Sequence, residues 1–296
     1  MPKRVLAILN RPSMDAPAHD PDAMPLHFAD VAQPHLSVLD LAATRGDGIF
    51  ETLSVCGGVP QALEHHLARF ARSAAMLDLP APDLNAWREV ILATVAKLEP
   101  AAEAFVKIVL TRGVEGMSVP TGWAYAEHSP DFTDARTRGI RVALLDRGYR
   151  HDVAHTSPWL LAGAKTLSYA VNKAVLREAA RRGADDVVFV SSDGILLEGP
   201  TSTLVYRRAN TLVTPAPDLG ILDGTTQANI FKFAAARGMQ TVVEAAGPDA
   251  LREADAAWLL SSVRLVAPIR LIDDVSFPID VDLSAAMNEY LLGLRE

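Results

Sequence analysis

The sequence predicts a mixed α/β protein built from two domains, and three observations lead to that prediction. The chain has 296 residues, a length that suits one large domain or two medium ones. Strand-like runs of apolar residues alternate with segments whose apolar residues recur at helical spacing. A polar stretch, EHSPDFTDARTRG, interrupts this pattern. We therefore expect a small N-terminal α/β domain at 1–126, a linker at 127–139 and a larger domain at 140–296.

The N-terminal domain includes a segment, 10–34, whose proline and aspartate content indicates irregular structure. GIFETLSV (48–55) is typical of a strand, Gly57-Gly58 of a tight hairpin turn, and the following VPQAL of the returning strand. The apolar spacing then predicts, in order, a helix within 63–79, a second helix at 84–98 and a strand at 105–111.

Strands and helices alternate in the C-terminal domain as well. The expected elements are, in order, a strand at 140–145, a helix at 170–182, a strand at 186–191, a short strand pair at 195–197 and 202–207, a strand at 211–214, a helix at 226–237, strands at 241–244, 257–261 and 266–272, and a helix at 283–294. No internal repeat or low-complexity segment is evident.

Composition and charge narrow the function classes. Apolar residues make up 49 % of the chain and charged residues 22 %, which is ordinary for a globular protein, and the net charge is −8. No block of basic residues interleaves with aromatics, so neither nucleic acid nor an anionic membrane is an expected partner. The one cysteine, Cys56, makes an intrachain disulfide impossible and a cysteine-based zinc site implausible. No stretch resembles a signal peptide or a membrane span, so we expect a cytoplasmic protein.

Lys165 lies in LAGAKTLSYAVNKAV (161–175), among small and mostly apolar neighbours, just before a predicted helix. Two interpretations are open from these residues. The amine points outward and is solvated, or it is kept poorly solvated so that it can be neutral, nucleophilic and joined to a carbonyl group.

GILDGTTQANIFKFAAARG (220–238) places Thr225 and Thr226 at the start of a predicted helix, directly after a glycine turn. Free backbone N–H groups, hydroxyls and the helix dipole together form a site for a phosphate dianion. Alternatively, one of the two threonines only caps the helix.

Charged residues near predicted strand ends and on the first helix are further candidates. Glu198 ends a short apolar strand before Gly199-Pro200, where a carboxylate is either exposed or paired with a buried cation such as a protonated heterocyclic nitrogen. Arg69 lies near the apolar stripe of the 63–79 helix, so it either extends to solvent or meets an anion.

Arg45, Arg112 and Arg264 flank strand ends, where loops build sites, although solvated surface positions would also explain them. His65 and His66 are adjacent, so they point to different faces of a helix and are weak metal ligands. No metal site is expected.

Several of these motifs together resemble the class IV aminotransferases, which are pyridoxal-phosphate enzymes of fold type IV. The motifs occur in the family's order: RGDGIFET, HLARFARSA, GAKTLSYAVNKAVLREAARRGADDVVFV, EGPTSTLVY and GILDGTTQ. The resemblance extends from about Arg45 to about Pro268. It implies a small N-terminal α/β domain and a larger, β-barrel-like domain that binds pyridoxal 5′-phosphate (140–296).

The resemblance also implies roles for single residues. Lys165 matches the Schiff-base lysine, which also moves protons, and Glu198 matches the carboxylate that binds the pyridine nitrogen. The residues that match the phosphate contacts of the family are Arg69, Gly224, Thr225, Thr226 and, more loosely, Ser262. A carboxylate beside the ring nitrogen keeps that nitrogen protonated, and the protonated ring withdraws electrons from the substrate.

The departures from the family pattern bear on the substrate. Phe50 stands where D-amino-acid transaminases carry a tyrosine, and TRGVEGMSVPTGW lacks their second arginine after Arg112. The AKTLSYAVN and GTTQ motifs look more like those of aminodeoxychorismate lyases than like those of branched-chain transaminases. Arg45, Arg112 and Arg264 are candidates for binding the two substrate carboxylates.

The sequence is therefore interpreted first as an aminodeoxychorismate lyase-like enzyme of folate biosynthesis, forming 4-aminobenzoate and pyruvate through a Schiff base on Lys165. The alternative on the same scaffold is a transaminase of branched-chain or other amino acids, with D-amino-acid transamination less expected. A protein that binds a phosphate ligand without catalysis, with Lys165 as a counter-ion, is a third interpretation. The resemblance also implies a homodimer.

Overall fold

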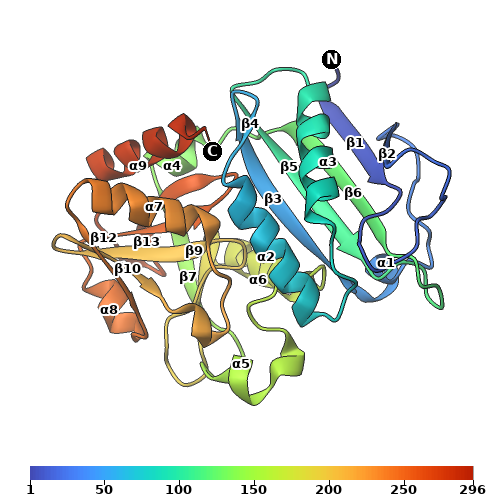
Figure 1. The fold of residues 1–296 in the computed structure, drawn as a ribbon. Helices are drawn as coiled ribbons and strands as arrows, with labels where there is room; N and C mark the ends of the chain where they lie inside the picture. The colour runs from blue at the N-terminus through green and yellow to red at the C-terminus, as the bar shows by residue number, and fades with distance from the viewer. Residues whose placement is uncertain (296) are drawn as a thin grey trace. The chain divides into compact units, whose positions relative to one another are not determined.

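The computed structural model describes residues 1–295, which divide into two compact units (Figure 1). The first unit contains Met1–Pro130 and Ala164–Tyr169, together with the last residues from Leu294 on. The second unit contains Asp131–Gly163 and Ala170–Gly293. The change of unit after Pro130 falls inside the segment expected to be a linker. Lys165, which the sequence division placed in the second domain, groups with the first unit.

A six-stranded antiparallel sheet forms the centre of the first unit, in the order β2-β1-β6-β5-β3-β4. Its strands are β1 (Arg4–Leu9), β2 (Leu26–Ala29), β3 (Gly48–Cys56), β4 (Val59–Pro60), β5 (Glu103–Thr111) and β6 (Thr121–His128). The alternation of buried and partly buried residues along β5 and β6 is that of a sheet with one covered face.

Two helices, α2 (Leu63–Met76) and α3 (Leu84–Lys97), cover one face of this sheet (Figure 1). Asp83 caps α3 by accepting hydrogen bonds from the N–H groups of Asn85 and Ala86. Trp87 of α3 is fully buried and donates its indole N–H to the Pro12 carbonyl at 2.8 Å, which fixes the N-terminal segment to the helix layer. A short helix, α1 (Leu41–Arg45), precedes β3.

The second unit is built on an eight-stranded sheet of mixed direction, with β14 paired to β13 beside the path β11-β10-β9-β12-β13-β7-β8. The strands are β7 (Ile140–Asp146), β8 (Asp186–Val190), β9 (Thr203–Arg208), β10 (Thr211–Pro215), β11 (Gln240–Glu244), β12 (Ala256–Ser261), β13 (Leu265–Ile272) and β14 (Val275–Ser276).

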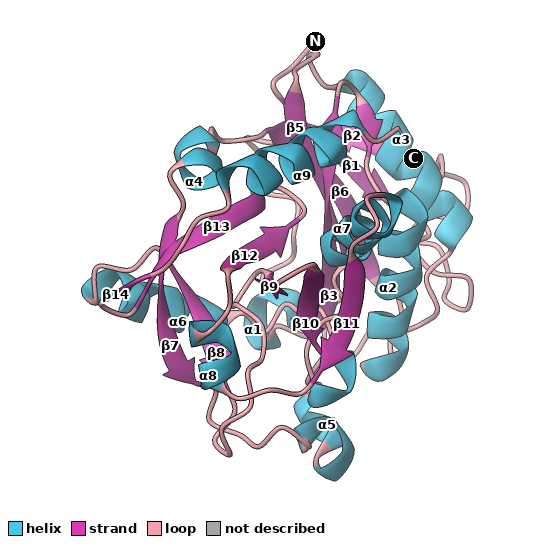
Figure 2. Ribbon diagram, turned by 90° about the vertical axis from the view of Figure 1, so that its left-hand side faces the viewer, coloured by secondary structure: helices cyan, strands magenta, loops and turns pink. Residues whose placement is uncertain are grey.

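Helices pack against this second sheet, and α4 and α9 lie beside β13 (Figure 2). The helices are α4 (Thr133–Thr137), α5 (Val153–Thr156), α6 (Ala170–Arg181), α7 (Thr225–Ala236), α8 (Pro248–Arg252) and α9 (Val281–Gly293). Alternate residues of β7 enter two different apolar clusters, Val142 in one and Ala143 in the other. Both faces of this strand are therefore covered, which explains its continuous apolar run.

The mixed α/β class with two units confirms the predicted fold class. The strand predicted at 48–55 and the helix predicted at 84–98 are observed within one residue at each end. The prediction of irregular structure over 10–34 is wrong at Leu26–Ala29, because this short strand gains its partner only when β1 lies next to it. A strand at 195–197 is also wrong, since only an isolated bridge joins Val190 and Leu196.

The loop after β5 contains a glycine, Gly113, at which a larger residue would clash with the backbone. Gly113 has φ +90°, and a Cβ there would lie 2.0 Å from the Val119 carbonyl oxygen. Gly116 in the same loop has φ +82° with open space around it. We expect Gly113→Ala to lower the free energy of unfolding by about 1–3 kcal/mol more than the control Gly116→Ala, because only the first variant adds a clash to the φ strain. Equal losses in urea denaturation would contradict this explanation.

Candidate functional site

The backbone of Lys165 is fixed to two elements of the first unit. The N–H of Phe50 in β3 donates to the Lys165 carbonyl at 3.0 Å, and the N–H of Lys165 donates to the Ser73 Oγ of α2 at 3.1 Å. The N–H of Leu167 donates to the Gly48 carbonyl at 2.8 Å. The loop that carries the lysine therefore continues the sheet beside β3, although it lies more than 100 residues further along the chain.

The side chain of Lys165 is partly buried, and its Nζ lies 4.5 Å from the centroid of the Phe50 ring. Phe50 in turn meets the Tyr169 ring edge-on, with the centroids 5.4 Å apart. An ammonium group over an aromatic face is attracted by the ring quadrupole. The aromatic ring and the partial burial shield this amine from part of the surrounding water.

A buried charged cluster lies between β3 and α2. Glu51, His66 and Arg69 are 0, 2 and 5 % exposed. The Arg69 Nε and Nη2 each donate to one Glu51 carboxylate oxygen at 2.7 Å, and the His66 Nδ1 lies 2.7 Å from Glu51 Oε2. A carboxylate only accepts hydrogen bonds, so the imidazole proton is on Nδ1. We name these three residues the buried triad.

The buried triad keeps its carboxylate ionised and its imidazole neutral. Burial alone would raise the pKa of Glu51, but the charge and hydrogen bonds of Arg69, with those of His66, hold this pKa below its usual value. Burial, together with the charges of Arg69 and Lys165, lowers the pKa of His66 below its usual value, although the charge and hydrogen bond of Glu51 act to raise it. The triad thus has no net charge near neutral pH.

Glu198 follows Leu197 in the second unit and is partly buried. Its Oε1 accepts a hydrogen bond from the Leu222 backbone N–H at 3.1 Å, which orients the carboxylate. Its backbone carbonyl accepts from the N–H of Phe189 in β8. Glu198 is therefore neither a fully exposed edge residue nor a buried group without polar contacts.

The start of α7 has the features of an anion site. The N-cap is Gly224, with no side-chain cap, and the first intrahelical bond joins the Ala228 N–H to the Gly224 carbonyl. Thr225 and Thr226 are helical residues, 6 and 8 % exposed, so neither caps the helix. A Cβ at Gly224 would lie 2.4 Å from Thr203 Oγ1, so a larger residue there would require Thr203 to shift. Two buried hydroxyls at an uncapped helix start suit a phosphate group.

Two of the three candidate arginines, Arg112 and Arg264, form ion pairs with aspartates. Arg112 binds the Asp47 carboxylate at 2.6 Å through Nε and donates to the carbonyls of Leu77 and Asp78. Arg264 donates to Asp186 at 2.6 Å. Arg45 is exposed and donates to the carbonyl of Thr44. Ser262 lies in the turn between β12 and β13.

Sequence reasoning missed several residues that surround the predicted ones. Glu51 is a charged residue within a predicted apolar strand, and this departure from the pattern was the signal that could have found it. Arg147 is stacked between two aromatic rings, 4.9 Å from the Tyr149 centroid and 4.8 Å from that of Phe189. Burial raises the pKa of Tyr149, and the Glu198 charge raises it further, which places this phenol in the electrostatic surroundings of Glu198.

Comparison with known proteins identifies the family. Residues 48–272 match the model of the amino-transferase class IV family, and the chain belongs to this family. It is 42 % identical over 262 residues to a bifunctional aminodeoxychorismate lyase / D-amino acid transaminase of Mycobacterium tuberculosis, an alignment covering 84 % of this chain and 91 % of the relative.

Solved structures agree with this assignment. A fold IV transaminase, CpuTA1, from Curtobacterium pusillum is 52 % identical, covers 98 % of this chain and 97 % of its own, and superposes with a TM-score of 0.94. The PLP-bound form of a hypothetical aminotransferase from Mycobacterium tuberculosis is 38 % identical, with 97 % of each chain covered and a TM-score of 0.87. The predictions of family, fold type IV and pyridoxal phosphate as cofactor are therefore confirmed.

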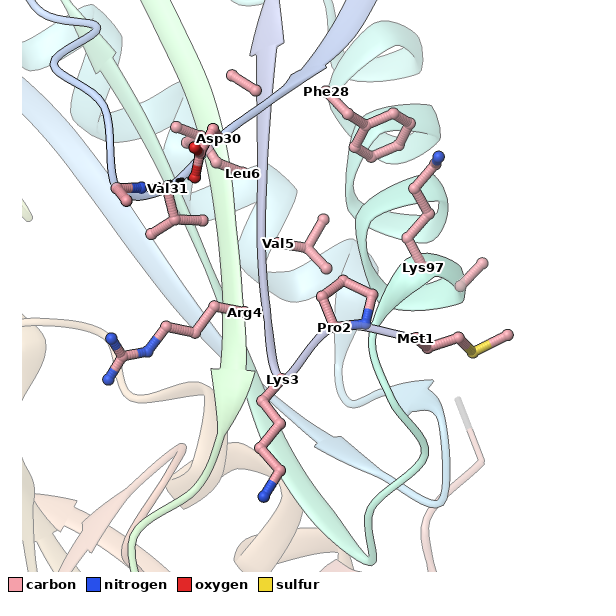
Figure 3. Close-up of a pocket in the computed structure, with 13 residues that line it drawn as sticks. Met1, Pro2, Lys3, Arg4, Val5, Leu6, Phe28, Asp30, Val31 and Lys97 are labelled. Atoms are coloured by element: carbon pink, nitrogen blue, oxygen red, sulfur yellow. Dashed lines mark hydrogen bonds between the residues drawn. The ribbon is translucent and has the colours of Figure 1, made fainter.

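Other kinds of site are not evident in the described part of the chain. Residues 1–295 contain no group of three or more histidine, cysteine and acidic side chains arranged to hold a metal ion. None of the described helices is long and apolar enough to cross a membrane. A groove of about 790 Å³ lies along β1 and the end of α3, between Met1–Leu6 and Lys97 (Figure 3), and none of the predicted site residues lines it.

The neutral His66 predicts a pH dependence of stability. The pKa of His66 is lowered in the folded protein, so below about pH 6.5 the unfolded chain binds a proton that the folded chain does not. Stability therefore falls as the pH drops below this value, by up to about 1.4 kcal/mol per pH unit for one proton. We expect His66→Asn, whose amide can still donate to Glu51, to remove this component in urea unfolding at several pH values.

His65→Asn is the matched control, because His65 is the exposed neighbour on the same helix. Its unfolding profile should keep the pH dependence of the wild type. If His66→Asn also keeps that dependence, His66 is not a neutral buried group.

Proposed function

We propose that this protein is a pyridoxal-phosphate-dependent aminodeoxychorismate lyase, which converts 4-amino-4-deoxychorismate to 4-aminobenzoate and pyruvate in folate biosynthesis. The observation that carries the proposal is the 42 % identity to a relative whose name includes this lyase, over 84 % of this chain. The residues present also fit the cofactor: an amine on an aromatic support, a carboxylate oriented by a backbone N–H, and an uncapped helix start with two buried hydroxyls.

In the proposed site, Lys165 would hold the cofactor covalently until the substrate amine displaces it, and the freed Lys165 amine would then act as the base. The bound cofactor supplies an electron sink for the carbon that loses a proton. The Lys165 Nζ removes the ring proton at the carbon that bears the amino group. The C–O bond to the enolpyruvyl side chain then breaks, and the side chain takes up a proton and leaves as pyruvate. The ring becomes aromatic, which drives the reaction forward.

The remaining proposed residues bind and orient the cofactor. Glu198 would accept a hydrogen bond from the protonated ring nitrogen, and its negative charge would keep that nitrogen protonated. The Leu222 N–H orients this carboxylate. The residues proposed to contact the phosphate, by resemblance to the family, are Arg69, Gly224, Thr225, Thr226 and Ser262.

The substrate carries two carboxylates, and arginine is the side chain that binds carboxylates through two parallel hydrogen bonds. Among the three candidates, Arg45 is the one whose side chain lies exposed, whereas Arg112 and Arg264 already bind Asp47 and Asp186. We therefore assign substrate binding first to Arg45. Arg112 and Arg264 remain candidates, but each would have to release its aspartate before it could bind a substrate carboxylate.

Transamination of an amino acid is the second candidate function. It is favoured by the name of the Mycobacterium tuberculosis relative, which includes D-amino acid transaminase, and by the 52 % identity to a transaminase. Here Lys165 would move a proton from the substrate α-carbon to the cofactor carbon instead of allowing a leaving group to depart. Both reactions require the same lysine, carboxylate and phosphate contacts, so these residues do not separate them.

The deciding experiment measures 4-aminobenzoate formation from aminodeoxychorismate by the purified, cofactor-loaded protein. We expect product with the wild type and a loss of at least about 1,000-fold with Lys165→Ala, because no other group then serves as both covalent anchor and base. A matched control is Lys173→Ala, since Lys173 is an exposed lysine on α6. Borohydride reduction of the loaded wild type should attach a pyridoxyl group to Lys165, and failure to attach it would support non-catalytic ligand binding.

The same preparation separates the lyase from the transaminase. An amino acid alone should leave the cofactor absorption unchanged if the protein is only a lyase, whereas a D- or L-amino acid that bleaches it shows a transamination half-reaction. A loaded protein that forms no 4-aminobenzoate but is bleached by an amino acid would contradict the first proposal. We also propose a homodimer in the cytoplasm, by resemblance to the family, which sedimentation of the loaded protein would check.

A further inference from the structure

The buried triad contains a complete ion pair in the interior of the first unit. Glu51 lies on β3 and meets Arg69 of α2 side-on, with both carboxylate oxygens engaged at 2.7 Å. His66, one helical turn before Arg69, adds a third hydrogen bond to the same carboxylate. A guanidinium held by two parallel hydrogen bonds cannot rotate out of the carboxylate plane without breaking one of them. Glu51 therefore fixes the plane of the Arg69 side chain.

Such a pair is an expensive way to stabilise a core. Removing two charges from water costs free energy that their attraction often only balances, and apolar residues of the same volume would stabilise the interior equally well or better. A second arginine–glutamate pair of the same geometry lies on the surface, where Arg88 of α3 binds Glu64 of α2 through Nε and Nη2 at 2.9 and 2.8 Å. That pair is solvent-exposed, and exposed pairs contribute little to stability.

The elements that carry the triad also bind the loop that carries Lys165. Phe50, which holds the Lys165 carbonyl, immediately precedes Glu51 on β3, and Ser73, which holds the Lys165 N–H, follows Arg69 by one turn of α2. The charge of Lys165 lowers the pKa of His66, so the imidazole and the amine are electrostatically coupled. The same strand and helix thus position the lysine and the arginine.

We propose that Glu51 is a positioning residue that sets the Arg69 guanidinium for binding the cofactor phosphate, with His66 holding the carboxylate in place. The inference rests on the proposed function, in which Arg69 contacts that phosphate. It assigns Glu51 no contact with substrate or cofactor. Its effect on the cofactor therefore passes through Arg69 and concerns the phosphate group specifically.

Glu51→Asp tests this role, because aspartate keeps the negative charge but is one methylene too short to engage both nitrogens of Arg69. The full-length protein is titrated with pyridoxal 5′-phosphate and, separately, with pyridoxal, which has no phosphate. We expect the affinity for pyridoxal phosphate to fall about 10-fold or more, with the affinity for pyridoxal changed less than about threefold. Equal losses for the two ligands, or no loss for either, would overturn the proposal.

Two comparisons complete the experiment. Glu64→Asp is the matched control, since it shortens the same kind of pair on the exposed side of the same helix, and it should change neither affinity. If Glu51→Asp does not fold, as judged by thermal unfolding, Glu51→Gln replaces it. The amide offers only one acceptor oxygen to the two Arg69 nitrogens, so the same selective loss of pyridoxal phosphate affinity is expected, and its absence would overturn the proposal.

Arg69→Lys separates a failure of this inference from a failure of the proposed function. Lysine keeps the charge but lacks the planar fork, so the preference for pyridoxal phosphate over pyridoxal should fall, and Glu51→Asp in this background should add no further loss. An unchanged preference in Arg69→Lys would remove Arg69 from the phosphate site and the proposal with it. A loss in Arg69→Lys without one in Glu51→Asp would overturn the proposal for Glu51 alone.

Discussion

The position of Lys165 depends on two hydrogen bonds of its backbone. The Phe50 N–H donates to the Lys165 carbonyl, and the Lys165 N–H donates to the Ser73 Oγ. These bonds attach a short loop to a strand and a helix that precede it by about a hundred residues. Backbone groups in a partly buried loop must find partners, and β3 offers them at the edge of its Gly48–Phe50 segment. The Lys165 backbone is thereby positioned by rigid secondary structure although the residue lies in a loop.

The residues proposed for catalysis and cofactor binding are divided between the two units. Lys165 and Arg69 belong to the first, whereas Glu198, Thr225 and Thr226 belong to the second. The two units position these side chains by different contacts. The first uses a buried charged cluster and the β3–α2 layer, and the second uses an uncapped helix start and a carboxylate held by a backbone N–H. The residues proposed to bind the cofactor do not by themselves fix the reaction, because one fold and one cofactor can support several chemistries.

Arginine shows why residue type alone is a weak guide to substrate binding. Arg45, Arg112 and Arg264 were equivalent candidates because each flanks a strand end. In the structure Arg112 connects Asp47 with the carbonyls at the end of α2, and Arg264 binds Asp186, which is buried. The two ion pairs join residues more than 60 positions apart in the chain, so no local pattern could reveal them.

The family, the cofactor and most of the regular elements could be predicted from local patterns in the chain. Helical spacing from Leu63 to Ala74, alternation in β3, and motifs in a fixed order are local properties, and local properties are visible in the chain. The remaining features became visible only in the folded protein, through the tertiary structure. It showed that Thr225 and Thr226 are not caps, that Leu26–Ala29 is a strand because β1 lies beside it, and that Glu51 is ionised within the interior. Each of these depends on a neighbour that is distant in sequence, and only folding brings such neighbours within hydrogen-bond distance.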